Sequence, residues 1–243
     1  MTIKHNFSAM LQPTNHACTQ AATAMLLSHY DPSATIAQVM QESPTQKKDD
    51  GSEAGSNMQQ LAAYCLDKGY EVELYSFDAI ILDLSWRDLS GQELLKKLEK
   101  VKDSREVKNL GKGPTRQYIE EYIAFIKKGG KLTIKPYPTT QLLTDLVGRG
   151  PLCVAISHPT MIGTGHTKGI GVRQDVQDDL KNGISTHALL VYGQNQAGDY
   201  MISDPWGHPQ DYTATPDQLI ASIMAAQWLC DNMFFRITSH KQS

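Results

Sequence analysis

The chain has 243 residues, of which 40% are hydrophobic and 20% are charged. This length is near the upper end of one ordinary domain, and the apolar content is enough for a sizeable core, which argues against a disordered, collagen-like or coiled-coil protein. The formal net charge is −3, from 23 basic and 26 acidic residues, so the chain lacks the global basic surface typical of nucleic-acid-binding proteins.

The N-terminal residues carry no apolar stretch of the kind found in a conventional signal peptide. No apolar run anywhere in the chain reaches the roughly 20 residues that a membrane-spanning helix needs. We therefore expect no membrane span. The protein is expected in the cytoplasm, or exported by a route without a conventional signal peptide.

Helical patterns dominate the first part of the chain. Apolar residues recur at helical spacing over 18–30, which predicts a compact, Ala-rich, buried helix. A short helix is expected near 36–40 and a third over about 55–68, separated by an exposed polar loop over 43–52. The alternating residues 70–75 then predict a strand.

The middle of the chain is charged and helical in pattern. Residues 91–108 carry a narrow apolar stripe, and 115–128 read as an amphipathic helix. Because lysines alternate with acidic residues there, we expect a solvated face and not a nucleic-acid site. We interpret about 84–128 as a helical insertion within a single domain that covers residues 1–243.

Short strands dominate the last part of the chain. Helices are expected over 140–147 and after a capping Thr215, and the region 158–185, which holds five glycines, reads as a long loop. Strands are expected at 132–135, 152–157, 187–192, 200–203 and 233–237. Helices first and an antiparallel sheet afterwards indicate an α+β fold.

The four cysteines are widely scattered, and no pair has the short spacing of a zinc or redox motif. Cys18 is distinct because it begins the first predicted helix. The unpaired N–H groups and positive dipole end of a helix N-terminus stabilise a thiolate and lower the pKa of the thiol. For a lone cysteine in an Ala-rich helix, however, a structural role is the commoner one. Cys65, Cys153 and Cys230 lie in apolar patterns and are expected to be inert core thiols.

His187 favours the reactive interpretation. It begins an apolar strand, where an apolar residue would be expected. If this strand and the next form a hairpin in which Gly193 faces Asp199, Asp204 lies close to His187. A thiol, an imidazole base and a carboxylate that orients the base are what nucleophilic catalysis requires.

Several segments resemble the papain-like cysteine peptidase clan, in its bacteriocin-leader-peptidase-like (double-glycine peptidase-like) branch. Gln12 precedes Cys18 by six residues, the spacing of the oxyanion glutamine and the nucleophile in papain-like peptidases. The other matching segments are Gly-Tyr-x-Val, Gly-Pro-Leu-Cys-Val-Ala-Ile, His-Ala-Leu-Leu-Val-Tyr-Gly and Ile-Ser-Asp-Pro-Trp-Gly, and together the similar blocks cover roughly residues 10–76 and 130–210.

The resemblance implies a papain-like fold, with an N-terminal helical part that carries the nucleophile helix packed on a C-terminal antiparallel sheet. It implies that Cys18 is the nucleophile, His187 the general base, Asp204 the orienting carboxylate and Gln12 the oxyanion donor. The sequence departs from many relatives at Thr19, where they have glycine, so a side chain there is expected to narrow the cleft or alter the approach of substrate. Segments 77–130 and 158–185 have no counterpart, which leaves the substrate open.

Three function classes remain at this point. The first is a free-standing bacterial cysteine peptidase that acts in its own cytoplasm or is delivered as a secreted effector. The second is a glutamine deamidase or acyltransferase that uses the same residues on a protein side chain. The third is a catalytically inactive binding module. The expected partner is a polypeptide or protein substrate, without nucleic acid; the oligomeric state is left open.

No cofactor is expected. Four of the histidines in the C-terminal half fall in loops or a strand without the short pairing of a helical zinc site, so a metal cluster is disfavoured. They are His158, His166, His187 and His208.

Overall fold

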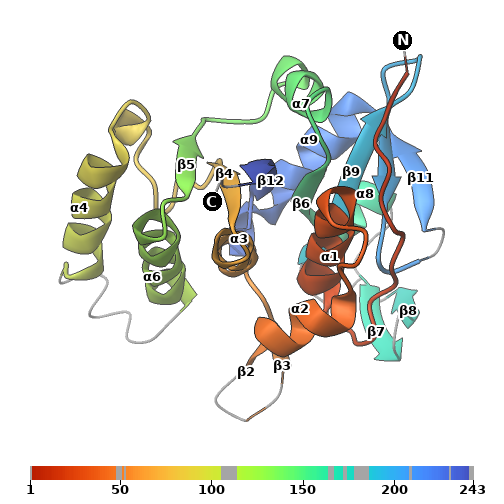
Figure 1. The fold of residues 1–243 in the computed structure, drawn as a ribbon, viewed down its shortest axis with the longest axis horizontal. Coiled ribbons are helices and arrows are strands. Elements are labelled where there is room, and N and C mark those ends of the chain that lie inside the picture. Colours follow the sequence, from red (N-terminus) through yellow and green to blue (C-terminus); the bar gives the residue numbers. More distant parts are fainter. Residues whose placement is uncertain are drawn as a thin grey trace.

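The structure is a computed structural model that describes most of the chain. The described residues are 2–47, 51, 53–104, 114–163, 167–171, 174–177, 186–207, 210–229 and 231–240. The α+β class is confirmed, because one large sheet carries helices on both of its faces (Figure 1).

The large sheet has eight strands, in the order β11-β10-β9-β6-β12-β4-β5, with β1 paired to β9. All neighbours are antiparallel except β4 and β5, which run parallel. The parallel pair departs from the expected antiparallel sheet, and it arises because a helical segment connects these two strands. The strands are β1 (Ile3–Lys4), β4 (Tyr70–Ser76), β5 (Lys131–Ile134), β6 (Leu152–Ser157), β9 (Thr186–Gln194), β10 (Tyr200–Ser203), β11 (Asp211–Ala214) and β12 (Met233–His240).

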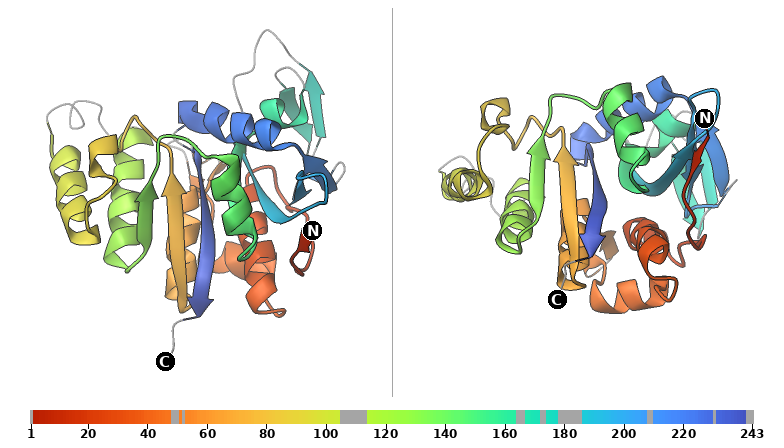
Figure 2. Two further views of the ribbon diagram at one scale, coloured as in Figure 1. Left: turned by 90° about the horizontal axis from the view of Figure 1, so that it is seen from above. Right: turned by 45° about the horizontal axis from the view of Figure 1, so that its top comes forward.

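Helices cover the sheet from two sides (Figure 2). The helices α1 (Cys18–Tyr30) and α3 (Met58–Asp67) lie on one face, and α7 (Thr140–Val147) and α9 (Pro216–Ala225) lie on the other. The position of strand β9 between the two helical layers explains why its sequence is continuously apolar. Ala188, Leu190 and Tyr192 pack toward α1, whereas Leu189 and Val191 pack toward α7 and α9, as expected for a strand buried on both faces.

Two more helices form a pair at one side of the molecule, beyond β5 (Figure 1). They are α4 (Gly91–Lys102) and α6 (Pro114–Lys127), and α6 also contacts α3. Ser90 and Glu93 form a capping box that fixes where α4 begins. Among the helices in the described ranges, none is both long enough and apolar enough to cross a bilayer.

The expected loops hold more structure than the sequence predicts. The region 43–52 contains β2 (Gln46–Lys47), which pairs with β3 (Glu53–Gly55), and the short helix α2 (Ile36–Glu42) precedes it. The region 158–185 contains the helix α8 (His158–Ile162) and the strand pair β7 (Thr167–Gly171) and β8 (Gln174–Gln177). The prediction of continuous loops was therefore wrong in these parts, since segments of two to five residues carry too little periodicity to be recognised.

Candidate active site

Cys18 is the first residue of α1, as the sequence predicts. No side chain caps the helix. The N–H groups of its first turn therefore have no hydrogen-bond partner from a cap or from within the helix, and they lie at the end of α1 that carries the Cys18 thiol. The rest of α1 is buried on nearly every side, which anchors this end of the helix rigidly. Cys18 itself is partly exposed, whereas Cys65 and Cys153 are fully buried.

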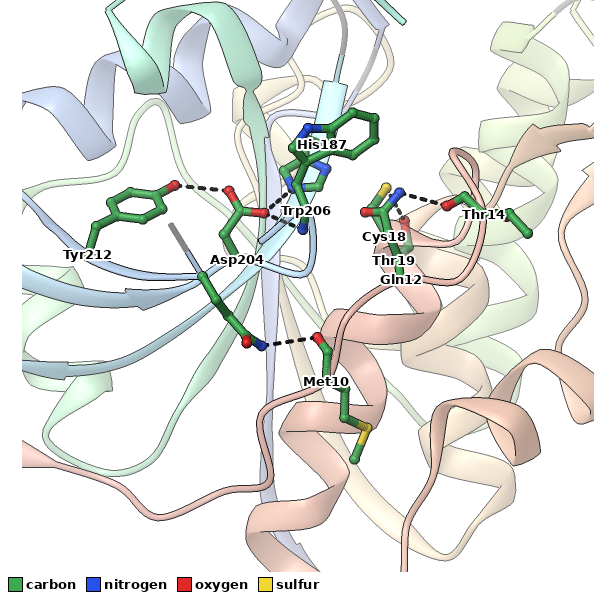
Figure 3. Close-up of polar contacts among 10 residues, drawn as sticks. Met10, Gln12, Thr14, Cys18, Thr19, His187, Asp204, Trp206 and Tyr212 are labelled. Atoms are coloured by element: carbon green, nitrogen blue, oxygen red, sulfur yellow. Dashed lines mark hydrogen bonds and ion pairs between the residues drawn. The ribbon is translucent and has the colours of Figure 1, made fainter. Parts of the chain in front are cut away.

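His187 and Asp204 form a buried ion pair. The Nε2 atom of His187 lies 2.6 Å from Oδ1 of Asp204, and both side chains are almost inaccessible to solvent. Since Nε2 is engaged by the carboxylate, Nδ1 is the ring nitrogen left for the hydrogen bond between His187 and the Cys18 thiol. Figure 3 shows the carboxyl group of Asp204 pointing toward His187, with Cys18 beyond the imidazole.

Two further donors hold the Asp204 carboxylate in place. The backbone N–H of Trp206 donates to Oδ1 over 2.8 Å, and the hydroxyl of Tyr212 donates to Oδ2 over 3.1 Å (Figure 3). Sequence reasoning missed Tyr212. The pairing of β10 with β11 brings it there, since Tyr212 lies opposite Ile202, two residues before Asp204, and no local sequence pattern marks this pairing.

The charges of the three residues support one another. Burial alone lowers the pKa of His187, but the Asp204 carboxylate outweighs burial and raises that pKa to about 10. Burial alone raises the pKa of the Cys18 thiol, but the hydrogen bond and charge of His187 outweigh it, so this pKa lies below its ordinary value. Burial raises the pKa of Asp204 as well, and the His187 charge reverses this effect. The arrangement increases the thiolate fraction of Cys18 and favours the imidazolium form of His187.

The register of the predicted hairpin was wrong, although its conclusion about proximity holds. Gly193 pairs with Met201 and not with Asp199, and a bulge between Met201 and Ile202 shifts the ladder once more. The pairing with β10 ends at Ser203, so His187 instead pairs with Ile156 of β6. A bulge changes which residues are opposite one another and leaves no clear mark in the sequence.

Gln12 lies in the N-terminal segment and is 1% exposed. Its side-chain Nε2 donates to the carbonyl of Thr14 over 2.7 Å, and its backbone N–H donates to the carbonyl of Pro205, the residue after Asp204, over 2.9 Å. The turn at Gly207 makes this approach possible, because Gly207 has φ +86° and a Cβ there would lie 2.5 Å from Leu11. The Asp-Pro-Trp-Gly segment thus holds both the carboxylate and the glutamine segment.

Aromatic rings pack around His187. His158 and Trp206 meet the imidazole edge-on, with ring centroids 5.2 Å and 6.1 Å away. Burial, reinforced by the His187 charge, lowers the pKa of His158 to about 4, so its ring is neutral near pH 7. His166 and His208 lie outside the described residues, and within the described residues no group of three potential ligands is placed to hold a metal ion.

A cavity of about 240 Å³ opens beside Cys18 and His187. Thr19 lines it, but its hydroxyl donates to the carbonyl of Ser56 over 2.9 Å and the residue is buried, so this side chain ties α1 to the segment before α3. The other lining residues are Asn15, His16, Ala54, Gly55, Ser56, Asn57, Met58, Tyr118, Ala155, Thr186, Ala188 and Asp231. The expected site residues Cys18 and His187 thus line one cleft, Asp204 is bonded to His187, and Gln12 lies on the segment before α1.

Comparisons with known proteins give structural neighbours only. No protein-family model matches the chain, and no curated protein matches it. A crystal structure described as a C39-like peptidase from Bacillus anthracis aligns over 100% of both chains, with 9% identity and a TM-score of 0.49. A double glycine motif protease from an AMS/PCAT transporter, in complex with its leader peptide, aligns over 97% of this chain and 94% of its own, with 12% identity and a TM-score of 0.43.

The names of both neighbours agree with the family that the sequence motifs resemble.

Proposed function

We propose that this protein is a cysteine peptidase that hydrolyses a peptide bond through an acyl-thioester. The observation that carries the proposal is the buried chain of contacts from the Cys18 thiol to His187 and on to Asp204, with a lowered pKa for the thiol. Cys18 is the proposed nucleophile, His187 the acid and base, Asp204 the residue that orients His187, and Gln12 the oxyanion donor. No step of this chemistry draws on a metal or a cofactor.

In the first half of the reaction, the Cys18 thiolate attacks the scissile carbonyl carbon. The imidazolium of His187 donates its proton to the leaving amine as the tetrahedral intermediate collapses to the thioester. In the second half, neutral His187 removes a proton from water, which attacks the thioester and releases the acid and the thiolate. Asp204 keeps the imidazole oriented through both halves.

The oxyanion that forms in each half needs donors. An amide nitrogen carries two N–H groups, and the Gln12 Nε2 uses one of them on Thr14, which leaves the other for the oxyanion. The first N–H groups of α1 supply further donors at the same end of the helix. The helical segment of about 84–128 is proposed as an insertion in one domain, and Tyr118 of α6 adds to the wall of the cleft.

The Gln12→Ala variant is expected to lower turnover by about 10²–10³-fold, since it removes one donor to the oxyanion. Its free energy of unfolding should fall by only about 1 kcal/mol, because a single hydrogen bond to Thr14 is lost. Gln210→Ala is a matched control, because the Gln210 amide donates to Met10 of the same segment and has no part in the proposed reaction. A Gln12→Ala protein with an unchanged rate, or one that does not fold, would assign Gln12 a structural role.

Mass spectrometry of candidate proteomes, exposed to the active protein or to Cys18→Ala, tests the reaction class. Peptide-bond hydrolysis is expected to create new chain ends that the Cys18→Ala sample lacks. An uncut product with the small mass gain of an amide-to-acid conversion would instead establish a glutamine deamidase, which shares the thioester step. Identical products in both samples would contradict any catalytic role of Cys18.

A further inference from the structure

A carboxyl group that the proposed reaction does not use lies in the wall of the active-site cleft. Asp231 follows the short helical turn η2 (Ala226–Leu229), precedes β12 and lines the same cavity as Cys18 and His187. The hydroxyl of Thr186, the residue directly before His187, donates a hydrogen bond to this carboxyl group. The contact fixes Asp231 against the strand that carries the proposed base.

One oxygen of this carboxyl group has no partner. The Oδ1 atom of Asp231 is buried and receives no hydrogen bond from any described residue. A buried acceptor without a donor costs free energy, so the described residues leave the charge of this carboxyl group only partly compensated. Burial raises the pKa of Asp231 to about 7, against the opposing effect of the Thr186 bond, so the group ionises readily once a cation is beside it.

The surroundings of Asp231 are acidic. No Lys or Arg is among the cavity-lining residues of the described chain, where the other titratable side chains are His16, Cys18, Tyr118 and His187. Glu121 and Asp78, which do not line the cavity, raise the pKa of Asp231 further through Coulombic repulsion. Both accept hydrogen bonds from neutral donors, and no ion pair within the described residues involves either. The imidazole of His187 is paired with Asp204, and among the described residues no ion pair involves Asp231.

We propose that Asp231 is a specificity-determining residue that binds a cationic side chain, lysine or arginine, of the substrate close to the bond that Cys18 attacks. The proposal rests on the proposed function, since it takes the cleft to be the active site. An ammonium or guanidinium group in the cavity pairs with the carboxylate of Asp231, which lines that cavity, and a charge-assisted hydrogen bond is strong in a partly desolvated wall. A neutral or acidic side chain at this position leaves the carboxyl group uncompensated.

Two thiol reagents of similar size and opposite charge test this without a known substrate. Trimethylammonium-ethyl methanethiosulfonate and sulfonato-ethyl methanethiosulfonate react with Cys18 by the same displacement, and the ratio of their rates cancels differences in thiolate fraction. Measured by mass spectrometry above the Asp231 pKa, the cationic reagent should react faster. Asp231→Asn should lower the ratio of cationic to anionic rates roughly tenfold, by loss of one nearby charge.

Variants separate the charge of Asp231 from general effects. Asp231→Glu should keep a high ratio, and Asp231→Ser replaces Asp231→Asn if the latter does not fold. Asp145→Asn, at an exposed carboxylate of α7 outside the cavity, should leave the ratio unchanged. A ratio that Asp231→Asn leaves unchanged, or that Asp145→Asn lowers equally, would overturn the proposal. Slow reaction of Cys18 with both reagents would instead contradict the proposed function.

Discussion

Iodoacetamide is expected to alkylate Cys18 in the folded protein at least roughly a hundredfold faster than Cys65 or Cys153. Only the thiolate reacts, and His187 lowers the pKa of the Cys18 thiol, whereas burial raises the pKa of each of the other two thiols well above its ordinary value. Cys18 is also the only one of these three that solvent reaches. Timed alkylation followed by peptide mass spectrometry gives the rate at each position.

The control for this experiment is the same measurement on the unfolded chain. In denaturant the thiols lose their environments, so their rates should converge toward one value. Cys230, which lies outside the described residues, is followed as a fourth site in both samples. Equal or later alkylation of Cys18 in the folded protein would overturn its assignment as the nucleophile.

Asp204→Asn is expected to lower turnover by about 10²–10⁴-fold while the protein remains folded, a range known for triads of this kind. Without the carboxylate, the pKa of His187 falls below about 10, so the imidazolium loses its proton at a lower pH than in the unchanged protein. The thiolate then loses its charged partner, and the pKa of Cys18 rises. The pH dependence of iodoacetamide alkylation should therefore move its midpoint upward, which a purely structural role of Asp204 would not produce.

Two variants of β11 show whether the effect belongs to Asp204. Asp211→Asn removes an exposed carboxylate opposite Ser203 and should leave both turnover and the alkylation profile unchanged. Tyr212→Phe removes one hydrogen bond to Asp204 and should have a smaller effect than Asp204→Asn in the same direction. His187→Ala should be at least as damaging as Asp204→Asn. Wild-type activity of Asp204→Asn would contradict the proposed orienting role.

The long, strongly patterned elements could be predicted from the sequence. The buried helix at Cys18–Tyr30, the helix at Thr140–Val147 and the strand at Leu152–Ser157 have the predicted bounds, because each carries a continuous apolar or amphipathic signal. The proximity of His187 and Asp204 also follows from the sequence, since two strands joined by a short turn must return the chain to the same place.

Other parts depend on contacts that the sequence does not encode locally. The bulge at Met201 and Ile202 displaces the hairpin register, and Tyr212 reaches Asp204 only because a further strand folds back on β10. Asp231 lies far along the chain from Cys18 and enters the cleft only through the path of the chain before β12. Each is a property of tertiary arrangement, so no pattern within a single segment marks it.

The contact between Gln210 and Met10 joins positions 200 residues apart along the chain, and the proposed nucleophile and base are similarly remote. During synthesis, α1 leaves the ribosome long before β9 and the Asp-Pro-Trp-Gly turn exist. Non-local pairings of this kind form late because the entropy of closing a long loop must be met first. The thiol of a nascent or partly folded chain therefore keeps its ordinary pKa and remains a poor nucleophile. Completion of the sheet brings His187 to Cys18 and lowers the pKa of the thiol, so the unfinished chain lacks the nucleophile that we propose.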